Sequence, residues 1–300
     1  MPGGASGRLR IDPFLTYMKS LSPMRCQLGE GPLWDADRRT LFWTDIPGGE
    51  LHAWHQATGE IRRVYRGEPV GGFTLEADGA LALFRVSDIA RLDPEDGRLQ
   101  TRPFSDSGMA RFNDVTADVR GRVFAGTIGR DDQSGGLFRF DPDGSDRLLF
   151  RGTGCSNGMG FSPDGRRMYW TCSTTRKIFH FDYAADTGEL THRRVFHACH
   201  PDEGIPDGLC VDREGFVWSA RWTGSCIVRQ SPADGAIVQT IPVPAELVTS
   251  CCFGGEARST LFITTARQAD KPDESGAGGV YAIETEAEGI PGHRSRLFCS

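Results

Sequence analysis

The chain has 300 residues, of which 38% are hydrophobic, and its formal net charge is −6 at pH 7. It carries no block of basic residues, so neither nucleic acid nor an anionic membrane surface is expected as a partner. No apolar run reaches the roughly 18 residues of a membrane span, and residues 1–20 lack the pattern of a signal peptide. A cytoplasmic protein is therefore expected.

The cysteines do not suggest a metal or redox motif. There are nine of them, an odd number, and none forms a CxxC pair. A thiolate zinc site or a thioredoxin-like motif therefore has no support. Several cysteines lie inside apolar runs, where a free thiol behaves as a small hydrophobic side chain, so we expect reduced, buried thiols.

Short β-rich runs, each with a turn sequence before it, recur along the whole chain. In order, they begin at Leu41, Leu81, Val123, Met168, Val217 and Leu261. Their spacing of about 40 to 49 residues is typical of four-stranded propeller blades. No stretch shows sustained helical periodicity with caps at both ends. The pattern predicts an all-β fold, a six-bladed β-propeller.

The predicted domain organisation is simple. Residues 1–20 are expected to form a loosely ordered extension, and residues 21–300 a single propeller domain. The repeat is least clear in the second unit, residues 71–100, and in the sixth, from residue 249 to the C-terminus. Propellers commonly close by lending a terminal strand to the last blade, and residues 16–26 are the candidate for that strand.

Four polar residues occupy the same position in four of the repeats. Each lies ten or eleven residues ahead of one of the β-rich runs; they are Glu30, Asn113, Asn157 and Asp207. In the same position the second and sixth repeats have Gly71 and Ser250, which offer no strong ligand. The same position in a repeat means the same place on each blade, just before the strand that lines the channel. We therefore expect the four side chains to meet at one end of the channel.

The four side chains are two carboxylates and two carboxamides, an all-oxygen set. Such a set suits a hard divalent cation such as Ca²⁺, Mg²⁺ or Mn²⁺. The two carboxylates balance its charge, and the remaining coordination positions would be open to water and substrate. The alternative is that these residues only form turns, because PDG, SNG and EGP are also good turn sequences.

Four ordered motifs give the chain a resemblance to a known family. GEGPLW, RFND followed by GRVFAGT, SNG followed by FSPDG, and PDG followed by VDREG resemble the SMP-30/gluconolactonase/regucalcin family. The resemblance extends from about Leu28 to the GGVYAI segment and is greatest to the bacterial sugar lactonases, namely gluconolactonases, xylonolactonases and arabinolactonases. It implies a six-bladed propeller that holds one divalent metal in its channel.

The resemblance also implies roles for particular residues. Glu30, Asn157 and Asp207 would be the metal ligands, and Asp207 the general base. Arg111 would bind the substrate. Asn113 would bind it too, and whether Asn113 also contacts the metal, directly or through water, is left open. The metal would be Ca²⁺ in the first place, with Mg²⁺, Mn²⁺, Zn²⁺ and Fe²⁺ as alternatives.

Two departures from the family pattern are visible. Where relatives carry a glutamate that contacts the substrate, this chain has Asp131, whose shorter side chain is expected to bind substrate in its place. The fourth repeat reads YWTCS where the family usually has YWTDS, so Cys172 replaces a carboxylate. This second change is expected to affect the packing of the blade more than the chemistry.

The implied reaction is the hydrolysis of a small sugar lactone by water attack on a metal-polarised carbonyl, in a monomer or weak dimer. Asp207 would either take the proton of the attacking water or only orient a metal-bound water. Two other functions are considered. One is hydrolysis of phosphotriesters or aryl esters at the same metal site, and the other is Ca²⁺ binding without catalysis. GCSNG at residues 154–158 matches the spacing of a GxSxG motif, but no helix is expected after it, so acyl-enzyme chemistry is not expected.

A few other residues have two readings. His197, Cys199 and His200, in HACHPDEG, would either bind a soft metal or belong to a loop over the channel mouth, where His200 could touch substrate. Asp45 is expected to cap a turn. The glycine-rich GTGCSNGMG lacks the lysine and the helix of a phosphate-binding loop.

Overall fold

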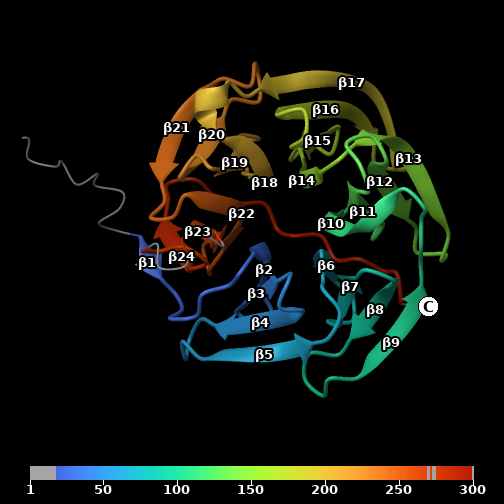
Figure 1. Cartoon of the computed structure of the whole chain (residues 1–300), viewed down its shortest axis with the longest axis horizontal. Helices are drawn as coiled ribbons and strands as arrows, with labels where there is room; N and C mark the ends of the chain where they lie inside the picture. Colours follow the sequence, from blue (N-terminus) through green and yellow to red (C-terminus); the bar gives the residue numbers. More distant parts are fainter. Residues whose placement is uncertain (1–17, 269–270, 272–274, 299–300) are drawn as a thin grey trace, which may run out of the picture.

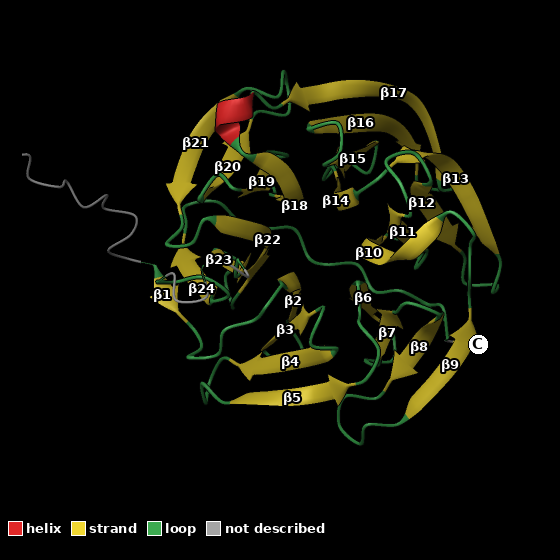
Figure 2. Ribbon diagram, viewed as in Figure 1, coloured by secondary structure: helices red, strands yellow, loops and turns green. Residues whose placement is uncertain are grey.

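The computed structural model describes residues 18–268, 271 and 275–298. In this part of the chain, the strands form six antiparallel four-stranded sheets around a central channel (Figures 1 and 2). The innermost strand of each blade lies next to the channel, and the following strands pair with it one after another outward. The predicted six-bladed β-propeller is therefore confirmed.

The blades follow the order of the chain. Blade one contains β2 (Gly29–Asp35), β3 (Thr40–Asp45), β4 (Glu50–His55) and β5 (Ile61–Arg66). Blade two contains β6 (Gly72–Leu75), β7 (Leu81–Phe84), β8 (Asp88–Leu92) and β9 (Leu99–Pro103). Blade three contains β10 (Met109–Ala117), β11 (Val123–Gly129), β12 (Gly135–Phe140) and β13 (Asp146–Thr153).

The second half of the ring repeats this arrangement. Blade four contains β14 (Ser156–Phe161), β15 (Arg167–Cys172), β16 (Lys177–Ala184) and β17 (Glu189–Ala198). A short 3-10 helix, η1 (Pro201–Glu203), leads into blade five, which contains β18 (Ile205–Val211), β19 (Val217–Trp222), β20 (Cys226–Gln230) and β21 (Ile237–Pro242). Blade six contains β22 (Leu247–Gly254), β23 (Thr260–Ala266), β24 (Val280–Glu284) and β1 (Lys19–Ser20).

The ring is closed by the two ends of the chain. Strand β1 pairs antiparallel with β24, Lys19 opposite Ala282 and Ser20 opposite Tyr281. This pairing is the closure expected from residues 16–26, of which 16 and 17 lie outside the described residues. Lys19 and Ser20 thus belong to the propeller, although the predicted domain boundary assigned them to the extension.

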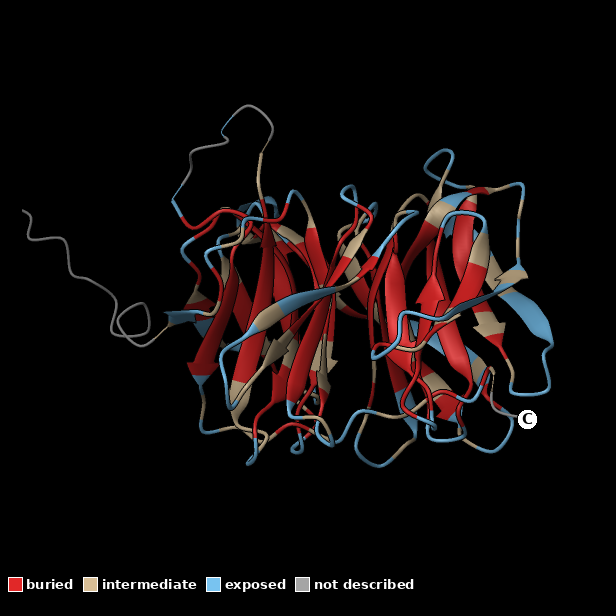
Figure 3. Cartoon of the chain, turned by 90° about the horizontal axis from the view of Figure 1, so that it is seen from below, coloured by how far each residue is buried: buried red, intermediate tan, exposed pale blue. Residues whose placement is uncertain are grey.

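The β-rich runs found in the sequence form the second strand of each blade. They are rich in β-branched and aromatic residues, which suit a strand covered on both faces. All six residues of β3 are buried, and Figure 3 shows buried strands through the body of the ring with exposed loops at its two ends. The core lies between neighbouring blades, where aromatic rings pack, as in the edge-on contact of Phe124 in blade three with Phe161 in blade four.

One detail of the predicted blade was wrong. The four polar residues were expected just ahead of the strand that lines the channel, and the β-rich run was taken as that strand. In the structure the segments around the polar residues are themselves the innermost strands β2, β10, β14 and β18. Gly, Pro, Asn and Asp have little β-propensity, so these segments read as turns in the sequence although packing against the neighbouring blades holds them extended.

The channel is crossed at one end by the C-terminal segment. After β24 the chain passes over the centre of the ring to its opposite side (Figure 1). Gly289 bridges to Asp212 after β18, and Ser295 bridges to Glu76 after β6. Both partners follow the C-terminal ends of innermost strands, whereas Glu30 and Asp207 lie near the N-terminal ends of theirs. The segment therefore covers the end of the channel that lies opposite these two carboxylates.

Two further expectations concern the whole chain. All eight cysteines in the described part of the chain are free, and they are buried or half-buried; Cys299 lies outside it. Within residues 18–268, 271 and 275–298, no helix has the length and hydropathy of a membrane-spanning segment.

Candidate functional site in the channel

The four polar residues singled out in the sequence lie in the four innermost strands of blades one, three, four and five. Each lies at or beside a register shift in the pairing between the first and second strands of its blade. Each side chain is 5% exposed. A β-bulge redirects a side chain from the regular alternation of a strand, so the repeated bulge places these four polar groups in equivalent positions around the channel.

Close backbone packing around the channel depends on the glycines that follow two of these residues. A methyl group on Gly158 would collide with the backbone nitrogen of Leu209 in the next blade. On Gly208 it would collide with the side chain of Ser250 in blade six. The innermost strands can approach this closely only because glycine has no Cβ.

The two carboxamides are joined in a network of hydrogen bonds. Asn113 donates through Nδ2 to Asn157 Oδ1 at 2.6 Å and to the Ser156 carbonyl oxygen at 2.9 Å. Arg111 Nη1 donates to Asn113 Oδ1 at 2.7 Å and to the Phe112 carbonyl oxygen at 2.8 Å. Arg111, Asn113 and Asn157 are therefore brought together, and their side chains are held in one orientation.

Ser173 supports this network and was not identified from the sequence. Its hydroxyl accepts a hydrogen bond from Asn157 Nδ2 at 2.9 Å and donates one to the Pro206 carbonyl oxygen at 2.7 Å. Because Nδ2 of Asn157 is occupied by Ser173, its Oδ1 is fixed on the side of Asn113. In the sequence, Ser173 is the serine of the YWTCS motif and directly follows Cys172.

Three buried carboxyl groups near this network interact through their charges. Burial raises the pKa of Glu30 well above its ordinary value, and the charges of Asp207 and Asp114 raise it further. Burial is also the main cause of the raised pKa of Asp207, and Asp114 adds to it. The positive charge of Arg111 acts in the opposite direction on both groups.

Asp114 is the other residue that the sequence reasoning missed. It directly follows Asn113, is 9% exposed, and has its pKa raised to about 7 by burial, which Arg111 partly offsets. Asp114 also lines a cavity of about 400 Å³ that extends along the channel toward the C-terminal segment. It was not singled out in the sequence, although the RFND motif already placed a carboxylate there.

The donor set fits a hard divalent cation. The Oδ1 atom of Asp207 is buried and has no hydrogen-bond partner among the described residues. A buried carboxylate oxygen without a partner is costly, and a cation is a natural ligand for it. Glu30 accepts a hydrogen bond only from the neighbouring Gly31 amide, at 3.2 Å, among the described groups. Glu30, Asn157 and Asp207 could therefore hold a metal through oxygen atoms alone.

Asp131 lies apart from this arrangement. It is in the exposed loop after β11, and its Oδ1 accepts hydrogen bonds from the backbone amides of Gln133 and Ser134 at 2.9 and 2.8 Å. These bonds hold the pKa of Asp131 below its ordinary value. In this conformation the carboxylate is directed at its own turn, so its contact with substrate stays a prediction.

Other residues weighed in the sequence have structural roles. Cys172 is 2% exposed, lies in the apolar core of blade four, and has its Sγ 3.1 Å from Thr153 Oγ1. Asp45 accepts hydrogen bonds from the backbone amides of Gln27 and Leu28, both at 3.0 Å, and so fixes the segment that enters β2. His200 is exposed and lies 3.3 Å from Asp202.

Comparison with known proteins shows which family and which solved structures this chain is similar to. Residues 28–267 match the family model described as SMP-30/Gluconolactonase/LRE-like region. The pentonolactonase XacC of Haloferax volcanii is 38% identical over 283 residues, which cover 90% of this chain and 95% of that protein.

Two solved structures are also similar. The calcium-binding protein regucalcin of Agrobacterium tumefaciens has a TM-score of 0.87 and 26% identity, covering 93% of this chain and 97% of that one. A gluconolactonase of Xanthomonas campestris has a TM-score of 0.73 and 25% identity, covering 89% of each chain. The model match begins at Leu28, as did the resemblance seen in the motifs, and it spans five of the blades completely. The chain belongs to the SMP-30/gluconolactonase family.

Proposed function

We propose that this protein is a metal-dependent lactonase that opens sugar lactones, pentonolactones among the first to be tested, to the corresponding sugar acids. The observation that carries the proposal is the unpartnered, buried Oδ1 of Asp207 in a group with Glu30 and Asn157, next to the Arg111–Asn113 pair. The activity named for the Haloferax relative and for the Xanthomonas structure supports it.

The metal would be held by Glu30, Asn157 and Asp207. Two carboxylates offset the charge of a divalent cation, and the all-oxygen set favours Ca²⁺, in line with the description of the Agrobacterium structure as a calcium-binding protein. When bound, such a cation polarises a lactone carbonyl and stabilises the negative charge that develops on its oxygen. Asp114 adds a third carboxyl group close by, which increases the negative potential of the site.

The Arg111–Asn113 pair would position the substrate. Arg111 is bound through Nη1 to Asn113 Oδ1 and to a backbone carbonyl, so the plane of its guanidinium is fixed. A guanidinium has five N–H donors, which leaves donors for the hydroxyl or ring oxygens of a sugar. A fixed donor reduces the entropy lost on binding and holds the ring in one orientation. Asp131 would contact the substrate only after its carboxylate gave up its hydrogen bonds to the backbone of its own turn.

Asp207 would act as the general base. As the oxygen of a water molecule forms a bond to the lactone carbonyl carbon, the carboxylate of Asp207 accepts the proton that this water loses. The bond between that carbon and the ring oxygen then breaks, and the proton passes to the ring oxygen, which becomes the hydroxyl of the sugar acid. Burial in the channel keeps the carboxyl basic, and a bound cation lowers its pKa again, so its proton affinity is set by the balance of the two.

A pH-indicator assay on chelator-treated protein tests the proposal. Pentonolactones, gluconolactone and paraoxon are offered in turn, and Ca²⁺, Mg²⁺, Mn²⁺, Zn²⁺ and Fe²⁺ are added back one at a time. We expect lactone hydrolysis that requires added metal and is lost in Asp207→Asn. Faster turnover of paraoxon would favour the phosphotriesterase alternative. Metal binding without turnover of any lactone would favour the non-catalytic calcium-binding alternative, and full activity of Asp207→Asn would remove Asp207 from the mechanism.

A further inference from the structure

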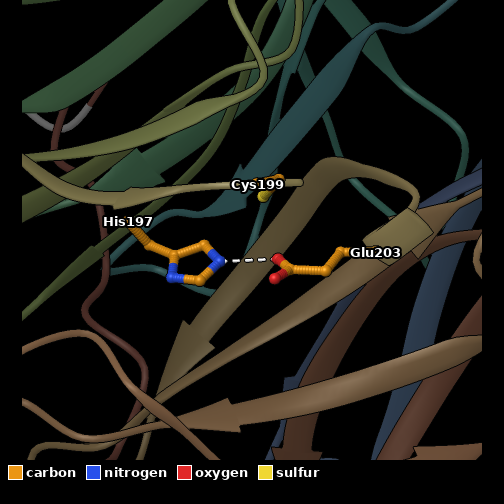
Figure 4. A group of neighbouring side chains, drawn as sticks. All are labelled: His197, Cys199 and Glu203. Carbon is orange, nitrogen blue, oxygen red and sulfur yellow. Dashed lines mark hydrogen bonds and ion pairs between the residues drawn. The ribbon is translucent and has the colours of Figure 1, made fainter. Parts of the chain in front are cut away.

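A second group of possible metal ligands lies where blade four is connected to blade five. His197 is near the end of β17, Cys199 follows that strand, and Glu203 is the last residue of η1. One ligand atom from each of the three lies within 4.8 Å of the other two. Figure 4 shows the His197 ring and the Glu203 carboxylate pointing toward each other, with the Cys199 sulfur beside them. His197 Nε2 and Glu203 Oε2 are 2.7 Å apart.

A buried guanidinium adjoins the sulfur of this group. Arg221, in β19, is 0% exposed, and its Nη1 donates to Cys199 Sγ at 2.5 Å. Its Nε and Nη2 atoms are buried and have no hydrogen-bond partner among the described residues. Burial raises the pKa of the Cys199 thiol, and the positive charge of Arg221 acts in the opposite direction and favours the thiolate.

We propose that His197, Cys199 and Glu203 form a second metal site, which takes a Zn²⁺-class cation through nitrogen, sulfur and oxygen. Imidazole, thiolate and carboxylate are the three ligand types that zinc binds in proteins, and a set of three leaves a fourth position for water. The ligand atoms of this site differ from those proposed in the channel, which are all oxygen atoms. It rests on different residues, so it does not depend on the lactonase proposal.

The observed geometry requires only small movements to bind the ion. With zinc–ligand bonds of about 2.0 to 2.3 Å, the ligand atoms of a tetrahedral site lie roughly 3.3 to 3.8 Å apart. His197 and Glu203 would therefore move apart by about half an ångström, and the sulfur would move inward by up to about one ångström. Binding releases the thiol proton of Cys199 to solvent, and no electron is transferred.

The segment that carries these ligands is already held in place. Arg176 Nη2 donates to the carbonyl oxygens of His200, Pro201 and Gly204 at 3.0, 3.2 and 2.7 Å. The thiolate and the carboxylate together neutralise the two charges of the cation, so the group keeps one net positive charge from Arg221, which remains a donor to the sulfur. The sequence had suggested His200 as the third ligand. The structure directs His200 to Asp202 and supplies Glu203 instead.

Cobalt(II) provides a direct test, because a thiolate bound to Co²⁺ gives a charge-transfer absorption that an all-oxygen site does not. Metal-free protein is titrated with Co²⁺ and then with Zn²⁺. We expect a thiolate-to-cobalt band that saturates and then disappears when Zn²⁺ displaces the cobalt. Cys199→Ser should abolish the band. His197→Gln and Glu203→Gln should weaken binding more than about tenfold.

Matched variants assign the band to this site. His200→Gln lies in the same loop, Cys155→Ser removes a thiol near the channel, and Asp207→Asn removes a proposed channel ligand; all three should keep the band. Circular dichroism and the thermal midpoint establish that each variant is folded. If Cys199→Ser does not fold, Glu203→Gln, which preserves the shape of the side chain, takes its place in the test. No band in the wild type, or an unchanged band in Cys199→Ser or Glu203→Gln, would overturn the proposal. Neither result would bear on lactone hydrolysis.

Discussion

Ser173 lies one step behind the channel residues, and its hydroxyl joins two of the segments that carry them. It accepts from the Asn157 amide and donates to the carbonyl just before Asp207. Ser173→Ala would leave the Asn157 amide free to rotate, so we expect metal affinity to fall about tenfold while the fold is retained. Isothermal titration with Ca²⁺ measures this. Ser162→Ala, the same change in a surface turn, is the control, and equal affinities of the two variants would contradict the assigned role.

The three buried carboxyls make the metal-free protein sensitive to pH. Burial raises the pKa of Asp114 from an ordinary value of 3.8 to about 7, and it raises those of Glu30 and Asp207 as well. Between the two values the folded protein binds more protons than the unfolded chain, so the free energy of unfolding decreases as pH rises. This contribution is fully present below the unfolded pKa and is lost as pH rises through the folded pKa.

We therefore expect chelator-treated protein to lose stability from about pH 4 to about pH 7, measured by urea unfolding at each pH. Asp114→Asn removes one of the titrating groups, so its stability should depend less steeply on pH over the same range. If the stability of the wild type instead rises through this range, the negative charges of the three carboxyl groups are compensated in the folded protein, contrary to this expectation. Saturating metal should reduce the loss, because the cation favours the ionised carboxyls.

At the scale of the element, the repeat in the sequence predicted the blades and the equivalence of the four polar residues. It did so because strongly apolar second strands recur with regular spacing. It did not show that the polar residues themselves lie in strands, since a bulged strand of Gly, Pro and Asn reads as a turn. Asp114 and Ser173 were missed for another reason. Their importance comes from contacts between blades, such as that between Ser173 and Pro206, and spacing within one repeat does not record those contacts.

The His197–Cys199–Glu203 group illustrates the same limit. The sequence brought His197, Cys199 and His200 together because they are neighbours in HACHPDEG. The 3-10 turn at Pro201–Glu203 reverses the direction of the chain and carries Glu203 back to His197. Distance along the sequence alone could not show whether His200 or Glu203 would complete the group.

Glu76 fastens the C-terminal segment to blade two. Its carboxyl group is fully buried and accepts hydrogen bonds from Ser295 Oγ at 2.6 Å, Leu297 N at 3.2 Å and Phe298 N at 3.1 Å. Glu76→Gln would replace one acceptor oxygen by an N–H donor and remove the charge. We expect unfolding free energy to fall by about 2–3 kcal/mol, because hydrogen bonds to a buried charged group are among the stronger ones.

Urea unfolding measures the loss, and limited trypsin digestion reports on the segment itself. Cleavage after Arg294 and Arg296 should become faster in Glu76→Gln, since local opening precedes proteolysis. Glu60→Gln, at an exposed position, is the matched control. If cleavage after these arginines is as slow in Glu76→Gln as in the control, Glu76 does not hold the segment.

At the scale of the whole molecule, the proposed metal would link blades that are far apart in the sequence. Glu30 belongs to blade one, Asn157 to blade four and Asp207 to blade five. An ion that binds only the folded ring stabilises it by mass action, by about 2.7 kcal/mol at a hundredfold excess over its dissociation constant. We expect the thermal midpoint to rise with added Ca²⁺ and to return to its starting value with chelator.

Glu30→Gln separates this effect from general ionic stabilisation. The variant removes one ligand charge, so its thermal midpoint should respond much less to Ca²⁺, with activity lost in parallel. Scanning calorimetry over a series of Ca²⁺ concentrations provides the measurement. An identical response of the variant and the wild type would place the stabilising ion elsewhere on the protein.

The pairing of β1 with β24 has a consequence for how the protein is made. Lys19 and Ser20 are synthesised before every other strand of the propeller, but their partners Tyr281 and Ala282 come after all of those strands. Until β1 and β24 pair, the sixth sheet has an unpaired outer edge, and such an edge can pair with other chains. The ring can close only after β24 has been synthesised, so we expect the propeller to be most prone to aggregate before that pairing forms.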